Sequence, residues 1–199
     1  MAILGIDASN ISRGGGLTHL MELLSHVDPE NYGFDQVILW APQATLASIT
    51  NKPWLIKKHC AVFEENYLKR ALWQSRELGR LLAIEKCDLL FVPGGSFTTR
   101  FRPVVTMNQN LLPFAFDEIR RYGLSALTLR FIALRISQAR SLKAADGTIF
   151  LTDYAREKVT ESISGKVNNI AVIPHGIDER FYCNPRPQRK IEDCSAQDP

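Results

Sequence analysis

The sequence predicts a doubly wound, Rossmann-like α/β fold, with a mostly parallel sheet and helices on both faces. Two observations predict it: short apolar segments recur along the chain, and helical patterns lie between them. The apolar segments do not alternate with polar residues, as expected of strands buried on both faces of a parallel sheet. Strands that alternate with helices build this class of fold.

Seven segments of four or five residues are the predicted strands, and most are rich in Val, Ile, Leu and Phe. The predicted strands are Ala2–Ile6, Gln36–Trp40, His59–Phe63, Leu89–Val92, Val104–Met107, Thr148–Leu151 and Ile170–Ile173. Apolar residues at helical spacing predict helices between them. The predicted helices are Leu17–Leu24, Leu68–Leu82, Ser125–Lys143 and Tyr154–Ser162. Thr152 or Asp153 is placed to cap the last one.

The composition is that of an ordinary globular protein and excludes several functional classes. The 199 residues include 24 Lys and Arg against 21 Asp and Glu, and this formal charge of +3 is too small to predict a nucleic-acid binder. No apolar segment approaches the roughly 18–20 residues of a membrane span. The amino terminus also lacks the basic region of a secretory signal. We therefore expect a cytoplasmic protein.

One domain is predicted over residues 1–182, followed by a linker or disordered tail over residues 183–199. The tail carries a single large apolar residue, Ile191, and three prolines that interrupt regular structure. Four cysteines lie far apart in the chain and form no C-x-x-C pair. Their spacing predicts reduced thiols, not a zinc site or a disulfide framework.

A glycine-rich loop follows the first predicted strand, where ligands of doubly wound sheets bind. It carries Asn10 and the three glycines Gly14, Gly15 and Gly16, and it opens onto the helix that contains His19. Glycines let a ligand approach the backbone, and the start of a helix offers free N–H groups to a phosphate or a sugar hydroxyl. A flexible turn that needs a positive φ is the alternative.

Two nucleotide-binding motifs do not fit this loop. A dinucleotide fingerprint needs a glycine where His19 stands and an acidic residue at the end of the second strand, where Trp40 leads into Ala41 and Pro42. These departures disfavour an oxidoreductase that binds NAD or FAD. The chain also has no P-loop sequence and no D-x-D carboxylate clamp. We expect no cofactor and no metal ion.

Other polar loops are predicted at the same sheet edge. Gly94 and Gly95 form a second glycine turn after the fourth strand, and Gln109 and Asn110 follow the fifth. Side-chain amides both donate and accept hydrogen bonds, as recognition of polyhydroxylated ligands requires. For Asn110 the alternative is a turn cap before Pro113.

Two more candidates follow the last two predicted strands. Arg156 lies near the start of the helix after the sixth strand, and His175 lies beside Gly176 after the seventh. For His175 a functional role and a plain loop position are equal alternatives, because the sequence identifies no partner for its ring.

Residues 120–143 form a basic segment with five arginines, one lysine and no acidic residue, interleaved with large apolar residues. A basic amphipathic helix can rest on anionic lipid. On a helical wheel, however, these basic residues spread around most of the circumference. The alternatives are peripheral contact with the inner face of the plasma membrane, or a core helix whose arginines snorkel or line the cleft.

Five segments, in this order along the chain, are together similar to a known family. They are Gly14-Gly15-Gly16, Phe91-Val92-Pro93-Gly94-Gly95, Gln109-Asn110-Leu111-Leu112-Pro113-Phe114, residues 144–152, and Ile173-Pro174-His175-Gly176-Ile177-Asp178. Over residues 2–182 the chain resembles the amino-terminal half of retaining GT-B glycosyltransferases of group 1 (family four). The last segment is the most specific, since it resembles the motif I-P-[NH]-G-[IV]-D with a nearby phenylalanine, here Phe181.

The resemblance implies a division of labour between two domains. The amino-terminal half would bind a glycan or lipid-linked acceptor, and the glycine loop at residues 14–16 would lie near the donor diphosphate. A carboxyl-terminal half would hold the nucleotide-sugar donor through basic residues and an E-x7-E pair. Transfer would be metal-independent and would depend on positioning and on stabilising the departing phosphate. The segment at residues 111–114 resembles members that build bacterial surface polysaccharide.

This chain departs from the family at one sugar-contacting position. Many members have His-Asp or His-Asn where this chain has Gln109-Asn110, although an amide can still bond a hydroxyl. The residues expected to contact donor diphosphate or acceptor are Asn10, Gly14, Gly15, Gly16, His19, Gly94, Gly95, Gln109, Asn110, Arg156 and His175. No catalytic residue is assigned. We expect a hexosyl-type transferase domain that is inactive alone; the alternative is a non-catalytic half that recruits a separate donor domain.

Overall fold

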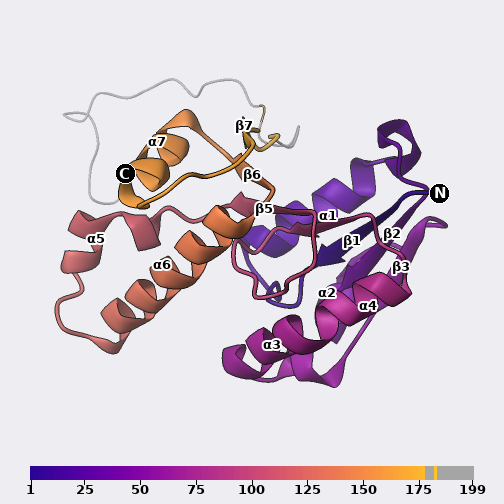
Figure 1. The fold of residues 1–199 in the computed structure, drawn as a ribbon, viewed down its shortest axis with the longest axis horizontal. Coiled ribbons are helices and arrows are strands. Elements are labelled where there is room, and N and C mark those ends of the chain that lie inside the picture. The colour runs from indigo at the N-terminus through magenta and orange to yellow at the C-terminus, as the bar shows by residue number, and fades with distance from the viewer. Residues whose placement is uncertain (178–181, 183–199) are drawn as a thin grey trace, which may run out of the picture.

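The computed structural model describes residues 1–177 and Tyr182, and its strands form one parallel sheet (Figure 1). The strands are β1 (Ile3–Asp7), β2 (Gln36–Trp40), β3 (Leu55–Lys58), β4 (Leu89–Val92), β5 (Val104–Asn108), β6 (Gly147–Phe150) and β7 (Ile170–Val172). Their order in the sheet is β3-β2-β1-β4-β5-β6-β7, and every neighbouring pair is parallel. The predicted doubly wound α/β fold is therefore confirmed.

Seven α-helices connect the strands within the described residues. They are α1 (Gly15–His26), α2 (Gln43–Ser48), α3 (Tyr67–Trp73), α4 (Gly79–Ile84), α5 (Phe116–Arg120), α6 (Ala126–Ala144) and α7 (Asp153–Ser162). A π-helical turn, Gln74–Leu78, joins α3 to α4. Thr152 caps α7, because its Oγ1 accepts a hydrogen bond from the N–H of Ala155 at 3.0 Å. This confirms the cap that the sequence predicts.

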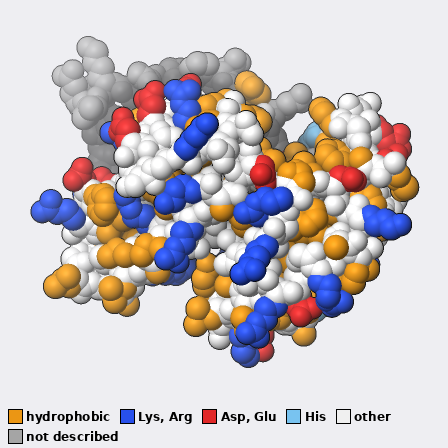
Figure 2. All heavy atoms as spheres, in the orientation of Figure 1, with side chains coloured by type: hydrophobic (Ala, Val, Ile, Leu, Met, Phe, Trp, Pro, Cys, Tyr) orange, Lys and Arg blue, Asp and Glu red, His pale blue; other side chains and the backbone are white. Residues whose placement is uncertain are grey.

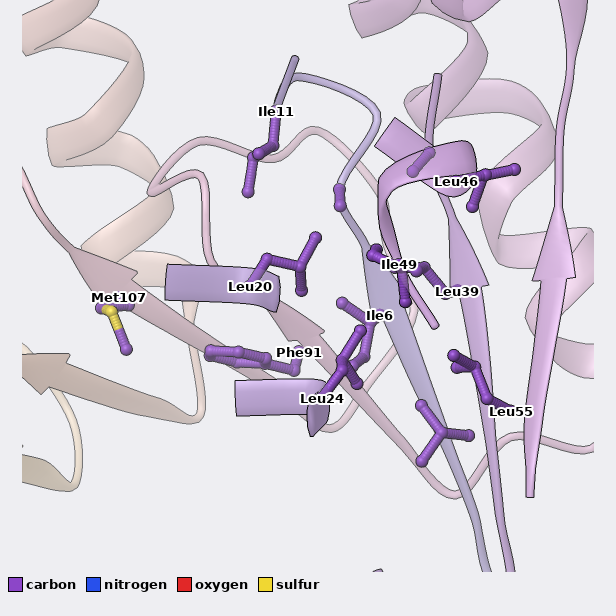
Figure 3. Packing of buried hydrophobic residues seen from close by; sticks show 13 residues of the cluster. Ile6, Ile11, Leu20, Leu24, Leu39, Leu46, Ile49, Leu55, Phe91 and Met107 are labelled. Carbon is purple, nitrogen blue, oxygen red and sulfur yellow. The ribbon is translucent and has the colours of Figure 1, made fainter. Parts of the chain in front are cut away.

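Helices cover both faces of the sheet, and each face has its own core. On one face, Leu20 and Leu24 of α1 pack with Ile6 and Phe91 of the sheet (Figure 3). On the opposite face, α4 packs through the fully buried Leu82. Since side chains alternate along a strand, β1 contributes to both cores. The last residue of β1, Asp7, therefore faces α3 and α4, while its neighbour Ile6 faces α1.

One predicted strand is wrong, and two short helices were not predicted. The segment His59–Phe63 is not a strand: β3 ends at Lys58, and Ala61–Glu64 is a 3-10 helical turn. Phe63 is buried because its ring meets Trp73 edge-on, with centroids 4.6 Å apart. An apolar pattern alone does not distinguish this packing from a strand. Helices α2 and α5 have only six and five residues, too few to show a helical period.

The other six predicted strands are confirmed with ends that shift by at most one residue. The predicted tail at residues 183–199, with Cys183, Cys194 and Ile191, lies outside the described residues, as do Asp178 and Phe181 of the proposed family motif. Among the described residues, no helix is both long enough and apolar enough to span a membrane.

Candidate functional site

The direction of chain winding reverses between β1 and β4, which are neighbours in the sheet. The chain goes from β1 to β2 on one side and from β4 to β5 on the other. The crevice at such a switch point, outside the carboxyl ends of the strands, is the usual ligand site of a doubly wound sheet. The segments that follow these two strands, residues 8–16 and 93–96, therefore form the candidate site.

The glycine loop leaves open space at the start of α1. Gly14 precedes the helix with a φ of 72°, and no side chain caps the helix start. A β-carbon at Gly14 or Gly15 would meet no atom within 4 Å. Gly14 has the positive φ that the turn alternative requires, whereas Gly15 and Gly16 have no positive φ. These two glycines leave backbone N–H groups accessible at the positive end of the helix.

Three loops converge at the switch point. A β-carbon on Gly94 would lie 3.9 Å from Cβ of Asn10, and one on Gly16 would lie 3.8 Å from Oε1 of Gln109. The amide of Gln109 also donates a hydrogen bond to the carbonyl of Pro93 at 3.3 Å. The structure thus brings together four predicted site residues from three loops: Asn10, Gly16, Gly94 and Gln109.

Several buried polar atoms at this edge have no hydrogen-bond partner among the described residues. They include Oγ of Ser9, Oδ1 of Asn10, Oγ of Ser96 and Oε1 of Gln138. Gln138 comes from α6 and lies against Gly95, where a β-carbon would be 3.3 Å from its Nε2. Buried polar atoms are nearly always paired with protein, water or ligand. Their accumulation marks this edge as a place where polar ligand groups can be recognised.

The turn after β4 is held in place by two helices. The hydroxyl of Ser141 on α6 accepts a hydrogen bond from the N–H of Phe97 at 2.9 Å and donates to its carbonyl at 3.1 Å. Thr98 Oγ1 donates to the carbonyl of Ala71 on α3 at 2.7 Å. Gly95, with a φ of 75°, sits inside this anchored turn. The second glycine loop is thus fixed in position at the sheet edge.

A buried carboxylate organises the start of the first loop. Asp7 accepts hydrogen bonds from the N–H of Ser9 at 3.0 Å and from Nε2 of Gln74 at 2.5 Å. Burial raises the pKa of Asp7 above its ordinary value of 3.8, although both hydrogen bonds oppose the rise. Gln74 belongs to the π-helical turn, a feature that is frequent at functional sites.

The sequence singled out neither Asp7 nor Gln74 as a site residue. The signal for Asp7 was present, since it is a carboxylate directly at the end of an apolar strand. Gln74 lies 67 residues away in the chain, and only the packing of the π-helical turn against β1 brings the two together. The same holds for Gln138, which reaches the edge from the middle of α6.

His19 and His175 form a pair. Their ring centroids are 4.6 Å apart with an interplanar angle of 69°, so the segment after β7 contacts α1. Burial lowers the pKa of His19, and repulsion from His175 lowers it further. The structure therefore supplies the partner for His175 that the sequence does not reveal.

Two predicted site residues are engaged elsewhere. Oδ1 of Asn110 accepts a hydrogen bond from the N–H of Leu112 at 3.0 Å, which confirms the turn-cap alternative. Arg156 forms ion pairs with Asp153 at 3.0 Å and Glu157 at 3.2 Å. In the described part of the chain, its side-chain partners lie on α7 and not in the switch-point loops. Its charge is therefore satisfied locally.

The fold and the site define a doubly wound, Rossmann-like α/β domain with a polar, glycine-rich switch point. In sequence comparisons, no protein-family model and no curated protein matches the chain. Over residues 1–177 and Tyr182, no three or more His, Cys, Asp or Glu side chains are grouped as metal ligands.

Proposed function

We propose that this chain is the acceptor-side domain of a retaining, GT-B-type glycosyltransferase that takes a sugar from a nucleotide-sugar donor. The observation that carries the proposal is the convergence of three loops at the switch point. The start of α1, with its open glycine backbone, lies beside the side-chain amide of Gln109, and Asn10 lies beside Gly94 of the second glycine loop. Free N–H groups suit a phosphate, and amides suit sugar hydroxyls.

The end of β2 argues against the competing NAD-dependent oxidoreductase. The strand ends at Trp40, which pairs with Asp7 of β1 and is buried. A dinucleotide site needs a carboxylate at that position for the ribose hydroxyls. Asp7 does not replace it, because its carboxylate is buried and bonded to Ser9 and Gln74.

In the proposed reaction this domain positions the acceptor. A bond forms between an acceptor hydroxyl oxygen and the anomeric carbon, the bond from that carbon to the diphosphate breaks, and the hydroxyl proton passes to the departing phosphate. The rate gain then comes from orientation and from stabilising the phosphate charge. By the family resemblance, the acceptor is a glycan or lipid-linked intermediate of bacterial surface polysaccharide synthesis, and most donor contacts belong to a second domain.

Amide chemical shifts measured with inorganic pyrophosphate as the probe test the phosphate side of the site. We expect the largest shifts at Gly15 and Gly16, and weaker binding in Gly16→Ala, whose new methyl group enters the site without backbone strain. Gly79→Ala is the matched control, because it adds the same methyl group on α4, 3.4 Å from Thr99 Oγ1. Unchanged shifts at the glycine loop would contradict the proposal.

A transfer assay tests the division of labour. We expect the purified 199-residue chain to transfer no sugar from UDP-glucose or GDP-mannose to saccharide acceptors, because the proposal assigns most donor contacts to a second domain. Sugar transfer by this chain without any partner protein would show that one domain suffices and would overturn the proposed division.

A further inference from the structure

A helical hairpin projects from the sheet and ends in exposed apolar side chains. Helix α5, the connecting loop and the first turns of α6 form this hairpin (Figure 1). Its apolar side chains, here called the α5–α6 tip, are Tyr122, Leu124, Leu127, Leu129 and Ile132. Figure 2 shows apolar side chains gathered at the projecting end of the molecule.

The exposed apolar side chains of the tip are unusual because they lie so close together in the chain. Leu124 is 107% exposed and Leu129 is 69% exposed, so neither contributes to the core of the described domain. Single exposed apolar residues are common on protein surfaces, but a contiguous apolar group marks an interaction surface. The five tip residues all lie within positions 122–132 of one hairpin, so exposed apolar side chains gather at its end.

The arginines of this segment differ in their surroundings. Arg135 turns inward: its guanidinium stacks over Phe116 at 4.2 Å and donates to the carbonyl of Ser162 at 2.9 Å. Arg120 and Arg130 are exposed beside the tip and form no ion pair within the described residues. Arg121 does pair with a carboxylate, that of Glu118, at 2.9 Å. Packing against the domain thus explains Arg135 but not Arg120 and Arg130, the two exposed arginines beside the tip.

Apolar residues flanked by unpaired arginines match the chemistry of an anionic lipid surface. Apolar side chains enter the boundary between headgroups and acyl chains, while basic residues contact the negative headgroups. A second copy of this chain fits less well, because its own arginines would oppose Arg120 and Arg130. No acidic residue occurs between positions 119 and 145 to offset that repulsion.

We propose that the α5–α6 tip docks this domain on an anionic membrane surface. Helix α6 runs from the tip back to the amino end of β6, so the tip lies toward the carboxyl edge of the parallel sheet. Docking would therefore bring the switch-point edge toward the bilayer. The proposal does not rest on sugar transfer, because it is argued from surface apolarity and charge alone.

Vesicle sedimentation tests the proposal. We expect the chain to pellet with vesicles of phosphatidylcholine and phosphatidylglycerol, and much less with phosphatidylcholine alone. The double variant Leu124→Ser, Leu129→Ser should bind at least about tenfold more weakly. The double variant Arg120→Gln, Arg130→Gln should lose the preference for anionic vesicles and the sensitivity to salt. Circular dichroism should show an unchanged fold in both, since all four side chains are exposed.

The matched control is the double variant Leu68→Ser, Ile84→Ser, which removes two apolar residues that are 77% and 59% exposed on α3 and α4. It should bind vesicles like the original chain. Equal loss in this control, or no binding of the original chain to anionic vesicles, would overturn the proposal. Self-association that Leu124→Ser abolishes, without vesicle binding, would instead assign the tip to a second copy.

Discussion

Nε2 of Gln74 donates a hydrogen bond to Oδ2 of Asp7 at 2.5 Å, linking the π-helical turn to the carboxyl end of β1. The other carboxylate oxygen accepts from the N–H of Ser9. One buried side chain therefore connects a helix on one face of the sheet to the first residues of the candidate ligand loop. We therefore expect substitutions at Asp7 to affect that loop.

The stability of the protein should depend on pH through Asp7. Because the pKa of Asp7 is raised above 3.8 in the folded state, its favourable contribution is complete below that value and is lost as the pH rises through the folded-state pKa. Asp7→Asn does not titrate at this position, so its stability relative to the original chain should increase over that interval. Urea unfolding at a series of pH values between 3 and 8 measures the difference.

Asp35→Asn is the control for this series, because Asp35 is a carboxylate that is 51% exposed. The rise for Asp7→Asn should exceed any change seen in this control. If the difference for Asp7→Asn is flat from pH 3 to 8, the inferred effect of burial is wrong.

The ring contact between His19 and His175 predicts that the titration of His19 depends on His175. The pKa of His19 should lie below 6.5, and His175→Gln should raise it toward that value without restoring it, because burial remains the larger cause. Since the folded-state pKa is lowered, the contribution of His19 to stability is present above pH 6.5 and is lost as the pH falls through the folded-state pKa. Proton NMR of the imidazole resonances follows the titration.

His26→Gln provides the comparison, since His26 is an exposed histidine on the same helix. It should leave the titration of His19 unchanged. A shift of equal size in both variants would argue against a specific contact with His175.

Cys87 should be unreactive in the folded protein. Burial raises the pKa of its thiol to about 12, and the nearby carboxylates of Glu85 and Asp88 add to the rise. Since the thiolate is the reactive form, iodoacetamide at pH 8 should leave Cys87 unmodified and should modify it only after denaturation. Peptide mapping by mass spectrometry separates it from Cys60, which is partly exposed. Rapid labelling of Cys87 under native conditions would contradict its burial.

The glycines of the two loops should tolerate alanine very differently. Gly95 has a positive φ, and a β-carbon there would lie 3.1 Å from the carbonyl oxygen of Met107. We expect Gly95→Ala to lower the free energy of unfolding by about 1–3 kcal/mol. Gly15→Ala faces open space and should change it by less than about 0.5 kcal/mol. Urea denaturation compares the two variants, and equal losses would show that the turn is less constrained than the structure indicates.

The accuracy of the sequence prediction followed the strength of the local signal. Strand β2 was located to the residue because Val37–Trp40 is a continuous buried run in a strand that has a neighbour on each side. Strand β3 was missed because it lies at the sheet edge, where Lys57 and Lys58 interrupt the apolar pattern. The segment Ala61–Glu64 instead appeared strand-like, because Phe63 is apolar for contact with a helix.

The features of the candidate site also differ in how well the sequence could predict them. Glycine loops and amides that follow strands could be recognised from the sequence, because parallel strands place all such segments at one edge. The hydrogen-bond partners of the polar groups could be anticipated only where they are close in the chain. Asn110 and Arg156 have partners within a few residues, whereas Gln138 reaches the edge from α6.

The sequence by itself determined the parallel, doubly wound sheet and the edge at which polar loops gather, since both follow from the order of apolar segments and the glycines between them. The tertiary structure alone decided which loops meet there, that Asp7 is buried beneath the first of them, and that the tip of the α5–α6 hairpin stays exposed. These features depend on contacts between residues tens of positions apart, such as Gln74 with Asp7 and His175 with His19. A local sequence pattern contains no information about such pairings.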